Sequence, residues 1–291
     1  MKPIAESFFS GASLIDVGLA RAGVEVVRSY ELDAKCVKVA RQNGHNSIQC
    51  DITQKLVKGH GKSNVRVFTW PCTKYSTIAD IHGCRTGDDL YLHGLRHMVI
   101  DRPDVFVCEN VPGMRKFPLV MEVLTELSGY YVTVFCPVQS QLWLPQQRDR
   151  LIIIGSRKAF NWRLPKSSRR TPLSAIVERD PQVTIPKYFY KRVNGGYRDL
   201  PIISDPAKND LAPTCVAHYA KDVSTRVIKD RRFPKGVRPY TVREYARLQG
   251  LPDSFSFAGV SNRDAYRMIG NGVSVPVGEW IGRELIRYFA V

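Results

Sequence analysis

The N-terminal part of the chain alternates between short apolar runs and amphipathic segments, and this alternation restricts the fold more than any other feature of the sequence. Residues 5–9, 24–31 and 48–51 are predicted to be strands, and residues 14–22 and 34–42 are predicted to be helices. Strand–helix–strand units join parallel strands through right-handed crossovers. The pattern therefore predicts an α/β fold built on a parallel sheet.

Further apolar runs extend the same pattern beyond residue 51. Strands are predicted at residues 65–70, 104–111, 130–137 and 151–155, and helices at residues 89–100, 118–127 and 277–289. The segment between the last two of these strands resembles a hairpin connection. The C-terminal helix is expected to pack beside the first helix, which would make the larger domain discontinuous in sequence.

The turn after the first strand fits a nucleoside cofactor. Gly11 lets the backbone approach a ligand closely, and the amides of the following helix can bind a carboxylate. Glu31 ends the second strand, where an acid can hold ribose hydroxyls, and Asp51 ends the third, where it can accept from an adenine amino group. Acids at strand ends are common, so these residues alone indicate a function only weakly.

A cysteine follows the strand predicted at residues 65–70. Pro71 stops that strand, because proline cannot donate to a sheet ladder, and Cys72 comes next. Ligands and chemistry gather at the carboxyl ends of strands in an open α/β sheet. Cys72 is therefore a candidate nucleophile, although a free cysteine is often a small buried apolar residue.

Two further segments place a carboxylate and two guanidinium groups beside strands. Glu109 ends one apolar run in Glu-Asn-Val, and Arg148 and Arg150 precede the strand at residues 151–155 in Gln-x-Arg-x-Arg. With Pro-Cys before them, these segments resemble, in order and spacing, the motifs of the cytosine-C5 DNA methyltransferases. The resemblance implies a Rossmann-like, S-adenosylmethionine-dependent methyltransferase sheet with a small, irregular target-recognition domain.

Two motifs near the C-terminus extend the resemblance over almost the whole chain. Thr241 and Glu244 form a capping box within Arg-x-x-Thr-x-Arg-Glu, which opens a helix that Gly250 ends. Gly-Asn-x-Val at residues 270–273 matches the final motif of the family. Pro-Cys alone is not specific, but this ordered set of five motifs is.

The resemblance assigns roles residue by residue. The implied catalytic residues are Cys72, Glu109, Arg148 and Arg150. The implied cofactor-binding residues are Phe9, Gly11, Glu31, Asp51, Ile52, Pro71, Leu90, Asn271 and Val273. The implied cofactor is S-adenosyl-L-methionine, and no metal is expected, since seven cysteines without a C-x-x-C pair do not suggest a zinc site.

The sequence departs from the family pattern in two places. The usual Phe-x-Gly-x-Gly-Gly is replaced by a run in which Ser13 and Leu14 stand for glycines, which implies a locally different turn or a displaced or altered cofactor. In the catalytic loop, Trp70 stands where proline is usual, and residues 73–75 replace Gln-Pro-Phe. Lys74 could depress the pKa of Cys72.

The charge balance favours a polyanionic partner. Lys and Arg number 43 against 27 Asp and Glu, a net charge of +16. Residues 158–257 are rich in proline and basic residues and are predicted to form the target-recognition domain and hinge, while residues 1–157 and 258–291 form the catalytic and cofactor-binding domain. The predicted nucleic-acid contacts are Ser76, Arg85, Lys187, Arg192, Thr214, Arg231 and Arg232. The loop at residues 77–88 is expected to close over a flipped base.

The implied reaction is methylation of C5 of a flipped cytosine in a short DNA sequence. Cys72 would add to C6, a protonated Glu109 would contact N3 and the N4 amino group, and Arg150 with Arg148 behind it would stabilise charge at O2. The alternatives are a tRNA cytosine-C5 methyltransferase and a catalytically silent DNA-binding relative. The expected partners are double-stranded DNA and a possible cognate restriction enzyme.

The sequence also predicts the cellular location of the protein. No apolar run is long enough to span a bilayer, and the start of the chain lacks the design of a signal peptide. We therefore expect a monomer without a membrane partner, in the cytoplasm of a bacterial or phage-infected cell.

Overall fold

The structure is a computed structural model that describes residues 1–73, 75, 90–166 and 169–291. The chain divides into two compact units. Unit 1 comprises Met1–Val138, Asp149–Pro165 and Val277–Val291, and unit 2 comprises Gln139–Arg148 and Lys166–Pro276. Unit 1 is thus assembled from three stretches of sequence, and the assignment of catalytic and recognition roles to the two units stays a prediction.

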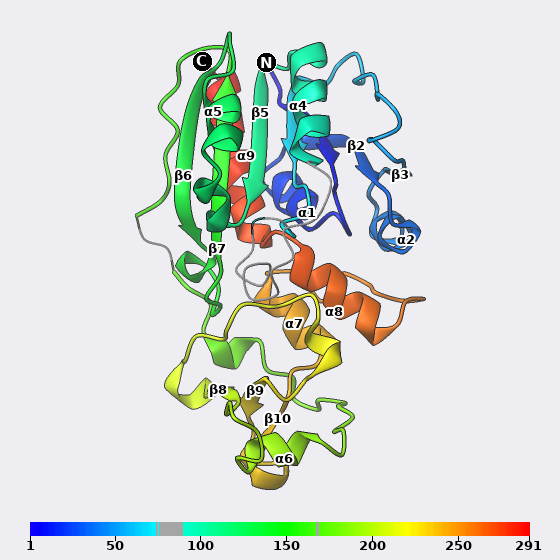
Figure 1. Cartoon of the computed structure of the whole chain (residues 1–291), viewed down its shortest axis with the longest axis vertical. Coiled ribbons are helices and arrows are strands. Elements are labelled where there is room, and N and C mark those ends of the chain that lie inside the picture. The colour runs from blue at the N-terminus through cyan, green and yellow to red at the C-terminus, as the bar shows by residue number, and fades with distance from the viewer. Residues whose placement is uncertain (74, 76–89, 167–168) are drawn as a thin grey trace. The chain divides into compact units, whose positions relative to one another are not determined.

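Unit 1 is built on a seven-stranded sheet with the order β3-β2-β1-β4-β5-β7-β6 (Figure 1). The strands are β1 (Ile4–Phe8), β2 (Glu25–Glu31), β3 (Ser47–Gln49), β4 (Val65–Phe68), β5 (Val105–Asn110), β6 (Tyr131–Gln139) and β7 (Asp149–Ser156). The pairs from β3 to β5 are parallel, whereas β5 and β7 are antiparallel. The predicted α/β class and parallel-dominated sheet are confirmed.

Helices cover both faces of this sheet. They are α1 (Leu14–Arg21), α2 (Ala34–Gln42), α4 (Leu90–Asp101), α5 (Pro118–Thr125) and α9 (Val275–Phe289). Figure 1 shows α5 on the viewer's side of the sheet and α9 behind it. Side chains of α4 and α5 join an aromatic core with Phe8, Phe68 and Phe106.

The C-terminal helix packs against the first helix, as predicted. A Cβ atom at Gly278 would lie 2.5 Å from the carbonyl oxygen of Ile15, and one at Gly282 would lie 2.6 Å from the Cβ atom of Ala22. Only glycine allows two helices to approach this closely. The two glycines of α9 therefore fix its contact with α1.

In its described residues, unit 2 contains a three-stranded sheet, three α-helices and several short 3-10 helices. Its sheet has the order β10-β9-β8, formed by β8 (Ile202–Ser204), β9 (Arg226–Lys229) and β10 (Val237–Pro239). Its helices are α6 (Phe189–Val193), α7 (Val242–Leu248) and α8 (Asn262–Asn271). The predicted capping box is present, since Thr241 accepts from the amide of Glu244 and the Glu244 side chain accepts from the amide of Thr241. In the part of the chain that is described, no helix is long and apolar enough to cross a bilayer.

Candidate active site

The order in which strands are added to the unit 1 sheet reverses between β1 and β4, and the candidate site lies at the carboxyl ends of these two parallel strands. Strand order reverses there, because β2 and β3 lie on one side of β1 while β4 and β5 lie on the other. Ligands of open α/β sheets bind at such switch points. Phe9 and Gly11 lie one and three residues after the end of β1, and Cys72 lies four residues after the end of β4.

Cys72 lies on a turn just beyond β4. The strand ends at Phe68, and the peptide amide of Tyr75 donates to the carbonyl of Cys72 over 2.9 Å. Cys72 is partly exposed, whereas Cys108 and Cys215 are buried and have raised thiol pKa values because of that burial. Its position and accessibility suit a nucleophile, whereas the two buried thiols are unsuited to that role.

The Glu-Asn-Val segment holds the Cys72 turn in place. The side-chain amide of Asn110 donates to the carbonyl of Trp70 over 3.1 Å. A Cβ atom at Gly113 would lie 2.1 Å from the carbonyl oxygen of Tyr75, so only glycine permits this approach. No roles were predicted for Asn110 and Gly113 from the sequence, although Asn110 directly follows Glu109 and Gly113 lies four residues after it.

Glu109 and Arg150 form a buried ion pair. Oε1 of Glu109 lies 2.7 Å from Nε of Arg150, and both side chains are about a tenth exposed, at 9% and 11%. The pair forms because β5 and β7 are antiparallel neighbours, with Glu109 opposite Ile152. A carboxylate held against a guanidinium is stabilised in its charged form. The structure thus brings together two of the four residues that were predicted to be catalytic.

Arg148 has a different environment within unit 2. Its guanidinium is buried and donates to the carbonyls of Cys215, Gly270 and Gly272 at 2.7–2.9 Å. These contacts tie the Gln-x-Arg-x-Arg segment to the Gly-Asn-x-Val motif. A catalytic role for Arg148 stays a prediction, and its contacts are those of a residue that positions backbone.

The turn after β1 has an unusual backbone conformation. Phe9, Gly11 and Ser13 all have positive φ angles, of 57°, 56° and 62°. A Cβ atom added at Gly11 would meet nothing within 4 Å, so the space above this residue is open. Ser13, which replaces a glycine of the family pattern, adopts a left-handed conformation that non-glycine residues avoid. Leu14 is buried at the start of α1, so it lies in the core and away from the open space at Gly11.

The acids predicted to hold the cofactor lie at the ends of β2 and β3. Glu31 accepts from the amides of Gly11 at 2.8 Å and Asp33 at 2.9 Å, which fixes its carboxylate beside the turn. The hydroxyl and amide of Thr53 donate to Oδ1 of Asp51, and these hydrogen bonds lower the pKa of that carboxyl. An open glycine turn flanked by two fixed carboxylates fits a nucleoside cofactor such as S-adenosylmethionine.

The remaining predicted cofactor residues lie on several segments. Ile52 follows Asp51 directly, Pro71 is exposed before Cys72, and Leu90 begins α4. In unit 2, Asn271 is exposed at the end of α8, and Val273 is buried beyond it. The assignment of these residues to cofactor binding stays a prediction.

A buried carboxylate on α1 follows the turn after β1, and no role was predicted for it from the sequence. Asp16 in α1 is fully buried, its Oδ2 accepts from the hydroxyl of Ser7 at 3.1 Å, and its Oδ1 has no hydrogen-bond partner among the described residues. Burial raises the pKa of Asp16 to about 7. The hydroxyls of Ser13 and Ser29 lie 3.4 Å apart nearby.

Some of the residues predicted to contact nucleic acid are exposed, whereas others form hydrogen bonds within unit 2. Lys187 is exposed. Arg192 is engaged within unit 2, since it donates to Ser224 and Asp222 and lies 4.6 Å from the ring centroid of Tyr197. The Thr214 hydroxyl donates to the carbonyl of Gln147 over 2.6 Å.

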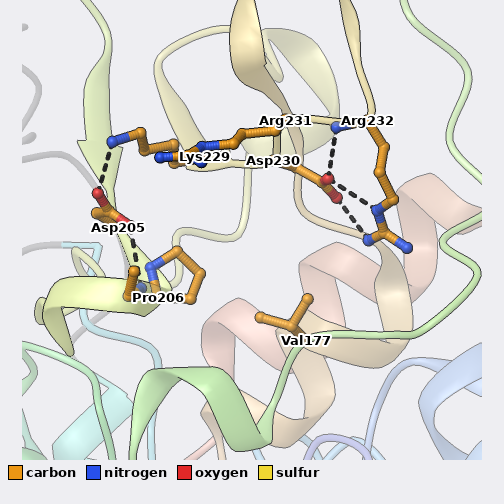
Figure 2. Close-up of a pocket in the computed structure, with 8 residues that line it drawn as sticks. Val177, Asp205, Pro206, Lys229, Asp230, Arg231 and Arg232 are labelled. Carbon is orange, nitrogen blue, oxygen red and sulfur yellow. Dashed lines mark hydrogen bonds and ion pairs between the residues drawn. The ribbon is translucent and has the colours of Figure 1, made fainter.

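Arg231 and Arg232 line a pocket of about 410 Å³ in unit 2 (Figure 2). Arg232 donates to both carboxylate oxygens of Asp230, and Lys229 pairs with Asp205 at 2.7 Å. Arg231 is exposed and has no ion pair within the described part of the chain. Of these cations, Arg231 is the most available to an external anion. Lys74, Ser76, Arg85 and the predicted base-covering loop at residues 77–88 lie outside the described residues.

A family model and two related proteins that match this chain are all described as DNA methylases or Type II methyltransferases. The model of the family described as C-5 cytosine-specific DNA methylase matches residues 5–200 and 212–287. The Type II methyltransferase M.FnuDI of Fusobacterium nucleatum is 25% identical over 322 residues, covering 96% of this chain and 93% of that protein. The Type II methyltransferase M.HpaII of Haemophilus parainfluenzae is 26% identical over 318 residues, covering 96% and 87%.

Solved structures have the same fold. The DNMT2 protein of Spodoptera frugiperda superposes with a TM-score of 0.80 at 18% identity, covering 98% of this chain and 100% of that chain. The methyltransferase EhMeth of Entamoeba histolytica gives a TM-score of 0.78 at 17% identity, covering 99% of both chains. At this identity, the likeness shows the fold alone.

Proposed function

The chain belongs to the C-5 cytosine-specific DNA methylase family, and we propose that it methylates C5 of one cytosine within a short sequence of double-stranded DNA. The observation that carries this proposal is the buried Glu109–Arg150 ion pair, whose Glu109 is next in sequence to Asn110, the residue that hydrogen-bonds to the carbonyl of Trp70 two residues before Cys72. A thiol, a carboxylate and a guanidinium are the groups that activation of a cytosine ring requires. The names of the curated relatives also support a role in DNA modification.

Cytosine C5 is a poor nucleophile until another nucleophile has added at C6. The Cys72 thiolate forms the bond to C6, and the electron pair of the C5–C6 double bond moves to C5, from which it is delocalised through N3 to O2. Charge then develops at N3 and O2. Once C5 carries the methyl group, a water molecule takes the C5 proton, the C6–Sγ bond breaks with its electron pair returning to Cys72 as thiolate, and the C5–C6 double bond re-forms. The base must leave the helix stack for this sequence, because its C6 face is covered in duplex DNA.

Glu109 and Arg150 bind the base and stabilise its developing charge. Arg150 is preorganised to stabilise negative charge at O2, since the ion pair fixes its guanidinium. Glu109 can accept from the N4 amino group as a carboxylate. Donation from Glu109 to N3 requires the protonated form of this side chain.

The cofactor site is proposed on the residues of the β1 turn and of the strand ends. S-adenosylmethionine supplies the methyl group when it is bound, and Gly11, Glu31 and Asp51 would hold its nucleoside. Ile52, Phe9, Pro71, Leu90, Asn271 and Val273 complete the proposed set. Arg148 would act through the Gly-Asn-x-Val motif, whose carbonyls it binds.

DNA contact is proposed for unit 2, and the net charge of +16 supports a polyanionic partner. Lys187, Thr214 and Arg231 are the proposed contacts, because their side chains reach the surface. We expect a monomer that modifies the sites of a cognate restriction enzyme where one is present. A cytosine in tRNA is the alternative substrate, since the same ring chemistry would serve it.

The test is to incubate the protein with S-adenosylmethionine and mixed-sequence duplex DNA, and to read methylation base by base. A parallel reaction with a labelled methyl group compares DNA with tRNA. The proposal expects 5-methylcytosine within one short DNA motif. Labelling of tRNA alone would replace the proposed substrate, and binding of DNA without any labelling would favour a silent DNA-binding relative.

A further inference from the structure

The segment that carries Asp51 and Ile52 is fastened to α4 at three points. Arg96 donates from Nη2 to the carbonyl of Ile52 at 2.6 Å and to the carbonyl of Lys55 at 3.3 Å. The amide of Val57 donates to Nε2 of His97 at 3.1 Å. Residues 51–57 have no regular secondary structure, so these contacts set where the segment lies.

The hydrogen bonds of His97 define its tautomer. Nε2 must accept, because the Val57 amide can only donate, and Nδ1 therefore carries the hydrogen that it donates to the carbonyl of His93 at 2.7 Å. The ring is fully buried, with its centroid 4.9 Å from that of Phe8. Burial lowers the pKa of His97, which keeps the imidazole neutral and able to accept.

The helix that bears these two residues also supports the catalytic turn. Tyr91 and Met98 of α4 lie in the same buried cluster as Phe68 and Trp70, which precede Cys72. A Cβ atom at Gly94 would lie 3.2 Å from Phe68 and 3.5 Å from Trp70, so α4 packs closely on this strand end. One helix thus positions both the end of β4 and the segment after β3.

We infer that Arg96 and His97 are positioning residues for the nucleoside end of the cofactor, because they fasten residues 51–57 so that Asp51 and Ile52 face it. This inference rests on the proposed cofactor site. Neither residue is assigned to touch the cofactor. They act through the backbone of the segment, as groups that hold binding residues in place often do.

The experiment measures the Kd of S-adenosylhomocysteine by calorimetry on the full chain. Arg96→Ala removes the donor to two carbonyls, and His97→Phe keeps the buried ring but removes the acceptor of the Val57 amide. Each variant is expected to raise Kd about tenfold, the factor that corresponds to one lost hydrogen bond of moderate strength. Arg96→Lys keeps a cationic donor and should recover part of the loss.

Two further readouts separate positioning from a general loss of structure. The KM for S-adenosylmethionine should rise while kcat at saturation stays unchanged, and DNA affinity without cofactor should not move. Arg283→Ala is the matched control, since it removes an arginine from an exposed pair on α9. That control should leave the Kd unchanged.

The outcomes distinguish this inference from the proposed function. An unchanged Kd in both Arg96→Ala and His97→Phe would overturn the inference, as would equal losses of cofactor and DNA affinity. If Arg96→Ala fails to fold, His97→Phe and Arg96→Lys still decide the result. A wild-type chain that does not bind S-adenosylhomocysteine at all would contradict the proposed cofactor site itself.

Discussion

Oε1 of Glu109 lies 2.7 Å from Nε of Arg150, across the antiparallel pair of β5 and β7. Each side chain therefore fixes the other in a site from which water is largely excluded. A preorganised pair of this kind can contact a cytosine ring without a further free-energy cost for orienting its groups.

The first prediction concerns the carboxylate of this pair. Glu109→Gln keeps the shape of the side chain but removes its capacity to take up a proton, so kcat should fall at least about 100-fold. DNA binding should be retained. Single-turnover methylation of a duplex carrying the target motif measures the effect, and Glu126→Gln, an exposed carboxylate in the same unit, is the control. A rate close to that of the wild type would argue against a role for Glu109 in catalysis.

The second prediction concerns the nucleophile. Cys72→Ser should abolish methyl transfer while leaving DNA affinity within about twofold, because a serine hydroxyl is a far weaker nucleophile near neutral pH. Cys136→Ser, a change at another partly exposed cysteine, should remain active. Methylation assays and gel-shift titrations check both variants. Retained methylation by the Cys72 variant would sink the proposed mechanism.

The third prediction isolates the strain at Ser13. Both Ser13→Gly and Ser13→Ala remove the hydroxyl, but only alanine keeps a Cβ atom at φ of 62°. We expect the free energy of unfolding of the glycine variant to be higher than that of the alanine variant by about 1 kcal/mol. In a helix interior, by contrast, alanine is the more stabilising of the two residues. Urea unfolding of the two variants measures this difference. If alanine were equally stable, the left-handed conformation of Ser13 would be doubtful.

The fourth prediction concerns pH. The folded pKa of Asp16, about 7, is raised above the ordinary 3.8. Its favourable contribution to stability is therefore fully present below pH 3.8 and is lost as pH rises to about 7, because the native state binds the extra proton. Asp16→Asn should remove this dependence. The stability of Asp16→Asn relative to the wild type should rise by about 2.7 kcal/mol between pH 5 and pH 8, as measured by chemical unfolding.

The fifth prediction concerns the core of unit 2. Arg238 is fully buried and binds Asp230 and Glu244, with three contacts of 2.7 Å. Arg238→Ala would leave the buried Glu244 without its cation and Asp230 with Arg232 alone, and it should lower the free energy of unfolding by about 3–5 kcal/mol. Arg231→Ala, an exposed change on the same hairpin, should cost little. Thermal unfolding that was equal for the two variants would contradict this account.

Much of unit 1 could be predicted because its elements are set by local signals. Helix α2 begins after the capping residue Asp33 and ends at Gln42, as its sequence indicated. The capping box at Thr241 and Glu244 was equally readable. Strand β4 was predicted two residues too long, because Thr69 and Trp70 continue the apolar run after ladder pairing has ended.

Other features depend on contacts that no local pattern encodes. Strands β8, β9 and β10 have three or four residues each, so their formation depends on pairing with one another. Arg148 and Arg150 are two residues apart, and a regular strand would point them the same way. Strand β7 starts at Asp149, so Arg148 lies outside the strand and its side chain need not point the same way as that of Arg150. Arg148 binds backbone carbonyls in unit 2 instead.

The discontinuity of unit 1 has a consequence for synthesis of the chain. The stretch Val277–Val291 supplies most of α9, which packs on α1, and the amino group of Met1 donates to the carbonyl of Phe289 at 2.8 Å. A ribosome delivers this stretch only after all of unit 2. Unit 1 therefore cannot complete its fold until unit 2 has already been made.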